Sequence, residues 1–279
     1  MQNSLSKTKL NQALANTVLK NQHHHRFYKL KSWLKALILP IGFILLCEFL
    51  VRRGLIDSYL LPAPSSLWQS FLELIHADLL SHIYISTWRV LIGFGIGSVL
   101  GLVCAVGVGL SKNIEDLLDP TLSAIKSIPS LAWIPLLLLW LGIDESSKLT
   151  LIAIGAFFPT YTNTVAAIQN VDPKLVELAK VYGLNRFQCI KQIILPAASP
   201  GVLTGLRNSL SLSWMFMIAA ELIAATKGIG YLLSDGRETS RPDIVILAII
   251  LLALLGKLSD TIMKIIEQWL LRWRESLPK

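Results

Sequence analysis

The chain has 279 residues, of which 53% are hydrophobic and 16% are charged, and its formal net charge is +8. Soluble globular proteins carry about 25% charged residues, so a water-soluble domain is excluded as the main architecture. The three cysteines are too few for a disulfide framework. The chain is therefore predicted to be an all-α integral membrane protein.

Long apolar blocks along the chain predict where the membrane is crossed. A helix of about 20 largely apolar residues spans the hydrocarbon core of a bilayer. Six blocks meet this requirement, so we predict six transmembrane helices at about residues 34–51, 88–111, 122–142, 148–169, 202–226 and 243–266. Residues 1–33 form a tail before them, and the membrane domain extends over 34–275.

The first block could also be read as a cleaved signal peptide, because basic residues precede it. Its apolar stretch is long for a signal sequence, and Arg52 and Arg53 follow where small residues would mark a cleavage site. A retained span is favoured. In the tail, His23, His24 and His25 cannot all face one metal ion from a regular helix, so we predict a solvated segment and no metal site.

The distribution of Lys and Arg between the loops predicts the orientation in the membrane. One side receives 14 basic residues, from the segments 1–33, 111–120, 169–200 and 267–279, and the other side receives 5. Both termini and the loop 172–196 are therefore expected in the cytoplasm. The net positive charge then follows from topology and from contact with anionic headgroups, and no nucleic-acid partner is expected.

Glycines recur every fourth residue in the second block, at Gly93, Gly97 and Gly101. A dinucleotide fingerprint would need a preceding strand, whereas this run lies inside an uncharged helical span. Glycines on one helix face allow a neighbouring helix to approach closely. We therefore predict helix packing here. The phosphate-binding pattern G-x-x-x-x-G-K-[ST] does not occur in the sequence, so no nucleotide cofactor is expected.

The loop between the fourth and fifth spans predicts two short helices. Asp172 is a good N-cap and Pro173 suits the first helical position. Gly183 most easily takes the left-handed conformation that ends a helix. Asn185 would cap a second helix, which Pro196 is expected to end. The pattern alone fits a docking element and an ordinary interfacial loop equally well.

Charged residues inside the spans each require a physical reason, since insertion of one costs at least about 2.5–3.5 kcal/mol. Glu221 lies in the middle of the fifth span. It could line a transport pathway or pair with a basic side chain of another helix, and the pairing is favoured. Arg89, Lys126 and Arg207 are expected to extend from helix ends toward the interface. Lys257 and Asp260 are expected to pair on one helix face.

The loop 172–196 resembles the EAA loop of ABC-importer permeases. The family pattern is E-A-A-x-x-x-G, then nine residues, then I-x-L-P. This chain has Glu177, Leu178, Ala179, Gly183, Ile193, Leu195 and Pro196 at the corresponding places. Only Leu178 departs from the pattern. The resemblance favours a docking element over an ordinary loop.

Further segments, within about residues 55–275, resemble the sulfonate/nitrate/taurine branch of these permeases. They are Leu61–Pro64, Pro129–Leu136, Trp140–Lys148, Gly155–Pro159, Leu195–Ala198, Ala220–Ile223 and Gly228–Tyr231. Within this branch, Gly142–Glu145 and Ala253–Leu258 are most similar to the aliphatic-sulfonate permeases.

The resemblance implies the type I ABC-importer permease fold with a cytoplasmic EAA loop that couples to a separate ATPase. The implied partners are a second permease copy, two ATPase subunits and a periplasmic or lipid-anchored binding protein, at the inner membrane. The implied cargo is a small organic anion, with aliphatic sulfonate first and taurine, nitrate, bicarbonate or a pyrimidine as alternatives. Glu221, Asn163 and Trp214 are the candidates for the translocation path.

Two other classes of protein fit the sequence less well. A secondary carrier would be expected to contain inverted repeats, and no internal repeat is visible. An intramembrane enzyme would need a catalytic motif such as H-E-x-x-H or G-x-S-x-G, and the sequence contains neither. We therefore expect no catalytic residue and no metal ligand in this chain.

Overall fold

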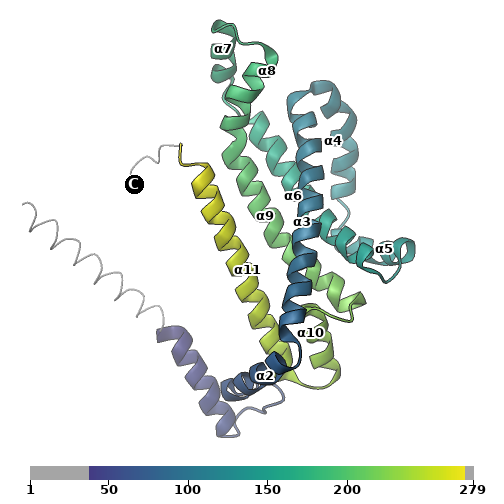
Figure 1. Cartoon of the computed structure of the whole chain (residues 1–279), viewed down its shortest axis with the longest axis vertical. Helices are drawn as coiled ribbons and strands as arrows, with labels where there is room; N and C mark the ends of the chain where they lie inside the picture. Colours follow the sequence, from purple (N-terminus) through teal and green to yellow (C-terminus); the bar gives the residue numbers. More distant parts are fainter. Residues whose placement is uncertain (1–37, 274–279) are drawn as a thin grey trace, which may run out of the picture. The chain divides into compact units, whose positions relative to one another are not determined.

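The computed structural model describes residues 38–273 (Figure 1). Within these residues the secondary structure is helical and contains no β-strand, so the all-α prediction is confirmed. The chain divides into two compact units, of which the first ends at Trp68 and the second begins at Gln69. The predicted tail 1–33, with its three histidines, lies outside the described residues.

In the first unit, an acidic residue of the first predicted span caps the next helix. Residues 38–52 are helical, and after a short connection the helix α2 (Pro64–His76) begins in this unit. The Ser65 backbone N–H donates to Glu48 Oε2 at 3.0 Å, and the Ser65 hydroxyl donates to Oε1 at 2.9 Å. Arg52 Nε lies 2.5 Å from the same Oε1. The charge of Glu48 is therefore balanced at the end of the helical segment.

The second unit contains the long helices and their connections. Its elements are α3 (Leu79–Leu110), α4 (Lys112–Lys126), the 3₁₀ turn η1 (Ser130–Trp133), α5 (Ile134–Leu141), α6 (Glu145–Gln169), α7 (Pro173–Val181), α8 (Arg186–Cys189), the π-helical turn η2 (Ile190–Ile194), α9 (Leu195–Ala224), α10 (Ile229–Glu238) and α11 (Pro242–Leu270). Figure 1 shows α7 and α8 at one end of this unit and α10 at the other.

Four helical runs among the described residues are long and apolar enough to cross a membrane. They are α3, α6, the continuous run Arg186–Ala224 and α11. The α4 helix and the segment Ser130–Leu141 would form a fifth crossing, although they are bent by 85° at the break between them. Because the first predicted span begins outside the described residues, the count of six stays a prediction.

Two predicted span boundaries differ from the helices in the structure. The second span was expected from residue 88, whereas α3 begins at Leu79. Ser81, His82 and Ser86 lower the hydropathy of its first turns, which hides them from a search for apolar blocks. The predicted span 122–142 is two helices, because the segment around Pro129 interrupts it.

The packing of α3 against α6 confirms the predicted role of the glycines. A Cβ atom at Gly93 would lie 2.6 Å from Cβ of Ile152, and one at Gly97 would overlap the backbone carbonyl of Ala153. Buried hydroxyl groups join the helices further along, where Thr160 Oγ1 of α6 lies 2.7 Å from Ser209 Oγ of α9. Small residues and hydroxyl groups thus hold the central helices together.

The expectation that Pro196 ends the second short helix of the loop is wrong. Helix α8 continues through the π-helical turn η2 directly into α9, and Pro196 lies in the first turn of α9. A proline needs no hydrogen-bond acceptor for its nitrogen, so it is tolerated where one helical geometry changes into another. The loop therefore connects rigidly to the long helix α9.

Candidate functional site

Local capping interactions hold the first helix of the loop between α6 and α9. The side chain of Asp172 accepts a hydrogen bond from the backbone N–H of Lys174 at 2.9 Å, and Pro173 occupies the first turn of α7. This N-cap satisfies one of the backbone donors that every helix leaves unpaired at its start. Both sequence predictions for the start of α7 are confirmed.

Gly183 ends α7 in the left-handed conformation, with φ of +70°. Its N–H donates to the carbonyl of Lys180 at 3.0 Å, and the N–H of Leu184 donates to the carbonyl of Ala179 at 3.0 Å. These two bonds form the Schellman motif, which favours glycine because other residues are strained at positive φ. A Cβ atom at Gly183 would meet no other atom within 4 Å, so backbone strain alone selects glycine within this chain.

A capping box starts the second helix of the loop. The backbone N–H of Gln188 donates to Asn185 Oδ1 at 2.8 Å, and that of Asn185 donates to Gln188 Oε1 at 2.9 Å. Arg186 Nη2 donates to the carbonyl of Leu110 at 3.1 Å, at the end of α3. The orientation of this turn is thus fixed both by its own cap and by the neighbouring helix.

Large apolar side chains on the surface of this loop are exposed. The exposed fractions are 49% for Leu178, 83% for Val181, 75% for Tyr182 and 71% for Phe187. We call these four residues the loop apolar patch. Leu178 and Val181 are three residues apart on one face of α7, and exposed apolar side chains grouped in this way mark a contact surface.

The other EAA-like positions divide between the surface and the interior. Glu177 is exposed and has no ion-pair partner within residues 38–273, whereas Ala179 is 1% exposed and faces the rest of the chain. Ile193 is half-buried and Leu195 is 42% exposed. Their part in coupling stays a prediction.

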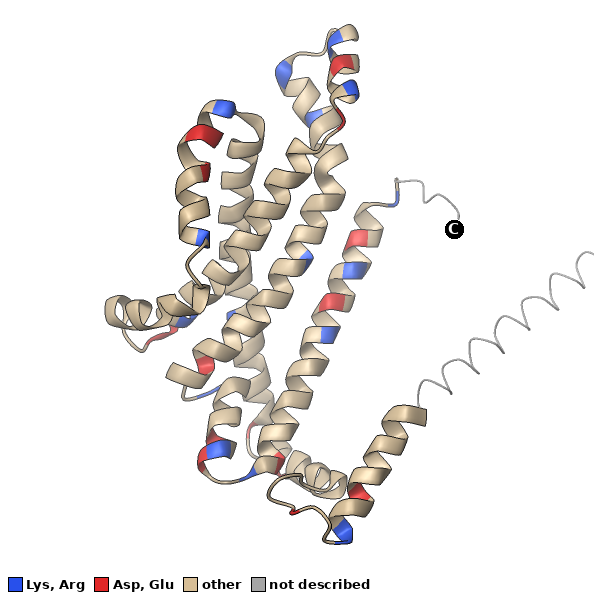
Figure 2. Ribbon diagram, turned by 180° about the vertical axis from the view of Figure 1, so that it is seen from behind, with Lys and Arg blue, Asp and Glu red and all other residues tan. Residues whose placement is uncertain are grey.

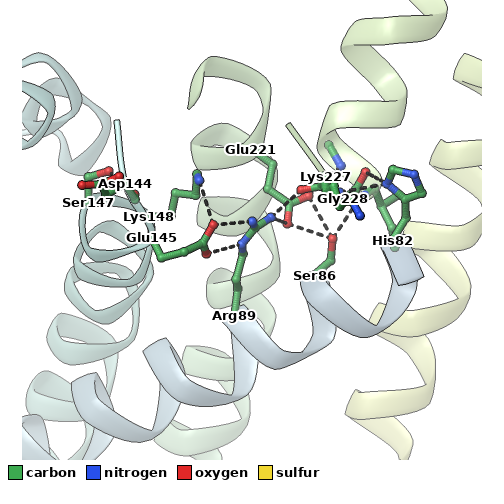
Figure 3. A network of polar contacts seen from close by, with 12 residues as sticks. His82, Ser86, Arg89, Asp144, Glu145, Ser147, Lys148, Glu221, Lys227 and Gly228 are labelled. Atoms are coloured by element: carbon green, nitrogen blue, oxygen red, sulfur yellow. Dashed lines mark hydrogen bonds and ion pairs between the residues drawn. The ribbon is translucent and has the colours of Figure 1, made fainter. Parts of the chain in front are cut away.

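A buried ion pair joins α3 to α9 near the end of the unit opposite the loop (Figure 3). Arg89 Nη1 lies 2.7 Å from Glu221 Oε1, and the side chain of Glu221 is fully buried. The structure therefore contains the favoured pairing of Glu221 with a basic side chain of another helix. A buried carboxylate without such a partner would be strongly unfavourable.

A second carboxylate binds the same arginine from α6. Arg89 Nε and Nη2 donate to the two oxygens of Glu145 at 2.7 and 2.6 Å, in a bidentate arrangement. Lys148 Nζ donates to Glu145 Oε1 at 3.0 Å and is itself buried. Two cations and two carboxylates from three helices thus balance one another. We call Arg89, Glu145, Lys148 and Glu221 the ion cluster.

The turn between α9 and α10 closes over the Glu221 carboxylate. The N–H of Gly230 donates to Glu221 Oε2 at 2.8 Å, and the Ser86 hydroxyl donates to the two carboxylate oxygens at 2.8 and 2.9 Å. Gly228 has φ of +129°, and a Cβ atom there would overlap the same carboxylate. A Cβ atom at Gly230 would lie 2.5 Å from Cβ of Glu221, so neither position has room for a side chain. His82 Nδ1 accepts from the Gly228 N–H at 3.0 Å.

Two arginines lie differently from the sequence-based expectation. Arg89 was expected to extend from a helix end toward the interface, but it is 4% exposed and lies in the interior of α3. Arg207 donates to Asp260 Oδ1 at 2.5 Å and Oδ2 at 3.0 Å, so it joins α9 to α11. Both expectations are wrong because the partners are distant in sequence. Lys126 is exposed at the end of α4, and Lys257 lies 3.8 Å from Asp260.

The other two candidates for a translocation path lie within the helix packing. Trp214 is 7% exposed, and its Nε1 donates to Ser259 Oγ of α11 at 2.8 Å. The Asn163 amide donates to the carbonyl of Pro159 at 2.8 Å, one turn earlier in α6. Its Cβ atom lies against Gly205 of α9. A role for Glu221, Asn163 or Trp214 in a path stays a prediction.

Comparison with known proteins connects these features to one family. The sequence profile described as "Binding-protein-dependent transport system inner membrane component" matches residues 97–272. This range contains the loop, α9, α10 and all of α11.

Among the relatives that match most of the chain are two permeases. The putative aliphatic sulfonates transport permease protein SsuC of Bacillus subtilis (strain 168) is 41% identical over 246 residues, which cover 88% of this chain and 89% of that protein. The protein of the same description in Escherichia coli (strain K12) is 42% identical over 247 residues, which cover 87% and 94%.

A solved structure described as an amino acid ABC transporter with histidines has a similar fold. The TM-score is 0.57 at 19% sequence identity, and the match covers 73% of this chain and 98% of that chain. At this identity the likeness supports the fold alone. The type I ABC-importer permease fold implied by the sequence is confirmed.

Proposed function

The chain belongs to the family of binding-protein-dependent transport system inner membrane components and is a permease subunit of an ABC importer, and we propose that its cargo is an aliphatic sulfonate. As a transport subunit it is a multi-pass inner-membrane protein and not an enzyme. The proposed cargo rests on the 41% and 42% identity, over nearly the whole chain, to two putative aliphatic sulfonate permeases.

The proposed transporter contains two copies of this chain, two ATPase subunits and a substrate-binding protein outside the membrane. The permease copies form the translocation path between them. The binding protein delivers the anion from the periplasm or from a lipid anchor, and ATP hydrolysis occurs in the ATPase. This division of labour agrees with the lack of a phosphate-binding loop in the sequence.

We propose that the loop apolar patch and Glu177 form the docking surface for the ATPase. The patch lies on α7 and the start of α8, and the rigid continuation of α8 into α9 supports its coupling role. Closure of two ATPase subunits would move α7, and α9 would carry this movement into the membrane. The remaining positions of the proposed coupling element are Ala179, Gly183, Ile193, Leu195 and Pro196.

The proposed orientation places both termini and the loop in the cytoplasm, as the excess of Lys and Arg on that side indicates. The ion cluster then lies toward the periplasmic end of the helices. Glu221 would stabilise the helices beside the path, because the ion cluster joins α3, α6 and α9. Asn163 and Trp214 remain the other proposed residues beside the path.

Growth on a single sulfur source tests the proposed cargo. A strain in which this gene is deleted should fail to grow on an alkanesulfonate, while growth on sulfate remains normal and the restored gene recovers the phenotype. The same strain is compared on taurine, and its uptake of nitrate, bicarbonate and a pyrimidine is measured. Loss of one of these instead, with normal alkanesulfonate growth, would assign the cargo to another branch of the family.

A further inference from the structure

One exposed face of α9 is polar at the depth where a membrane helix would meet lipid. Thr204, Asn208, Ser211 and Met215 are exposed, and their spacing of four, three and four residues places them on one side of the helix. We call Thr204, Asn208 and Ser211 the polar stripe. Glu221 and Trp214 lie on other sides of α9 and are buried.

Asn208 shows that this face does not suit a hydrocarbon environment. It is 16 residues from Ala224, or about 24 Å at 1.5 Å per residue, so it lies inside a hydrocarbon core about 30 Å thick, on the side of the loop. Its amide has no hydrogen-bond partner in the part of the chain that the structure describes. The hydroxyl groups beside it donate to their own helix, Thr204 to Pro200 at 2.9 Å and Ser211 to Arg207 at 3.2 Å. The amide N–H groups of Asn208 are thus free to meet another partner.

Charged side chains from α9 and α11 border the polar stripe. The side chain of Arg207 is 33% exposed and is held by Asp260, while Glu267 Oε2 lies 3.8 Å from its Nη1. Lys257 Nζ lies 3.8 Å from Asp260 Oδ2, and Lys264 follows one turn after Asp260 in α11. Figure 2 shows the basic and acidic residues alternating along the second half of α11. Three cations surround two carboxylates, so the local charge is positive.

We propose that the polar stripe and Arg207 line the aqueous path along which the anion crosses the membrane. Asn208 donates hydrogen bonds to the oxyanion in transit, and the positive surplus around Arg207 keeps an anion in this region. Asp260 positions the guanidinium of Arg207 and weakens its attraction for the anion, so that the anion can leave the site. This inference rests on the proposed function, since it deepens the path of the same importer.

Charge complementarity favours a hydrated anion beside this face of α9 over lipid or a closely packed second copy of the chain. Lipid would leave the Asn208 amide unpaired in hydrocarbon, which membrane proteins avoid by turning polar residues inward or toward water. A tightly packed protein contact would have to cover the exposed Lys257 and Lys264 as well. A hydrated anion satisfies the amide and the cations together.

Cysteine labelling of the assembled transporter in lipid nanodiscs tests the exposure to water. Cys47, Cys104 and Cys189 are first replaced by serine, and ATP hydrolysis by the complex verifies the background. Asn208→Cys is then compared with Leu258→Cys on the apolar exposed face of α11, where the leucine is 57% exposed. The reagent is 2-sulfonatoethyl methanethiosulfonate, which forms a disulfide with a thiolate and releases methanesulfinate. Asn208→Cys should react at least about tenfold faster, because thiolates form in water and not in lipid.

The proposal is overturned if Asn208→Cys reacts as slowly as Leu258→Cys in complexes that hydrolyse ATP. That result would mean that lipid or the second copy covers the stripe. Thr204→Cys and Ser211→Cys repeat the test with smaller changes, so failure of one variant to assemble leaves the outcome decidable.

A comparison of reagent charge tests Arg207. The trimethylammonioethyl methanethiosulfonate carries a positive charge, and Asn208→Cys should react faster with the anionic reagent. Arg207→Gln should lower this preference several-fold, and Asp260→Asn should raise it, because the two changes alter the local charge in opposite directions. If Arg207 and Asp260 had only a structural role, the two substitutions would shift the preference for the anionic reagent in the same direction or leave it unchanged. Either result contradicts the assignment.

The labelling is independent of the cargo proposed above. If the chain imports another molecule, the sulfonate growth test fails while Asn208→Cys still reacts. If only the path is wrongly placed, sulfonate growth is normal while Asn208→Cys remains unreactive.

Discussion

Arg89 Nη1 and Glu221 Oε1 lie 2.7 Å apart although 132 residues separate them in sequence. They join α3 to α9, and Glu145 brings α6 to the same guanidinium. The three helices thus meet at one guanidinium, where Arg89 and Glu221 are buried while the side chain of Glu145 is 57% exposed. The pair connects the helices that would frame a transport path.

Neutralising Glu221 should destabilise the permease. In the Glu221→Gln variant Arg89 keeps its charge in a buried position with Glu145 as its remaining acidic partner, and breaking a buried pair costs about 3–5 kcal/mol. We expect a lower thermal unfolding midpoint in detergent and lower uptake. The double variant Arg89→Gln/Glu221→Gln should recover part of the loss, and equal stability of Glu221→Gln and the parent would contradict the importance of the pair.

Gly97→Ala should destabilise the contact of α3 with α6. The added methyl group would overlap the backbone carbonyl of Ala153, which cannot move without separating the helices. Gly95→Ala is the matched control in the same helix, because a Cβ atom there meets nothing within 4 Å. Thermal unfolding of the two purified variants should therefore differ, with Gly95→Ala equal to or above the parent by up to about 1 kcal/mol.

Gly183→Val should impair coupling while the permease remains inserted and abundant. A residue with a side chain costs roughly 1–2 kcal/mol in the left-handed conformation, and valine would also alter the surface offered to the ATPase. We expect weaker co-purification of the ATPase and loss of uptake, with a milder effect for Glu177→Ala. Gly183→Asn is the control, since asparagine tolerates this conformation. Normal transport by Gly183→Val would exclude the loop as the coupling element.

The orientation predicts which loops react with a membrane-impermeant thiol reagent. A cysteine in place of Asp235 in α10 should be labelled from outside intact cells. A cysteine in place of Lys174 in α7 should be labelled only after the membrane is opened. Labelling of Lys174→Cys in intact cells, with protection of Asp235→Cys, would reverse the orientation.

The features that sequence reasoning predicted correctly depend on neighbours along the chain. The cap at Asp172 and the left-handed Gly183 follow from local backbone chemistry, and the spacing of Gly93 and Gly97 marks one helix face. The partner of Glu221 could not be identified from the sequence, because several basic residues on other helices could have paired with this carboxylate. Only the packing of α3 against α9 selects Arg89 among them.

The start of α3 was missed for a related reason. His82 and Ser86 appear unsuited to a membrane helix when each is judged by its own polarity. In the structure their side chains bind the turn at Gly228 and the carboxylate of Glu221. A hydropathy value is assigned to each residue alone, so it does not account for the hydrogen bonds that a polar side chain makes with a distant helix.

The double pairing of Arg89 has a consequence for how the protein is made. The ribosome completes α3 long before α9, so Arg89 enters the bilayer without Glu221. Glu145 follows it by 56 residues and can neutralise the guanidinium first, while the second carboxylate arrives much later. The order of the sequence thus offers the nascent chain a counter-charge for Arg89 before Glu221 has been made.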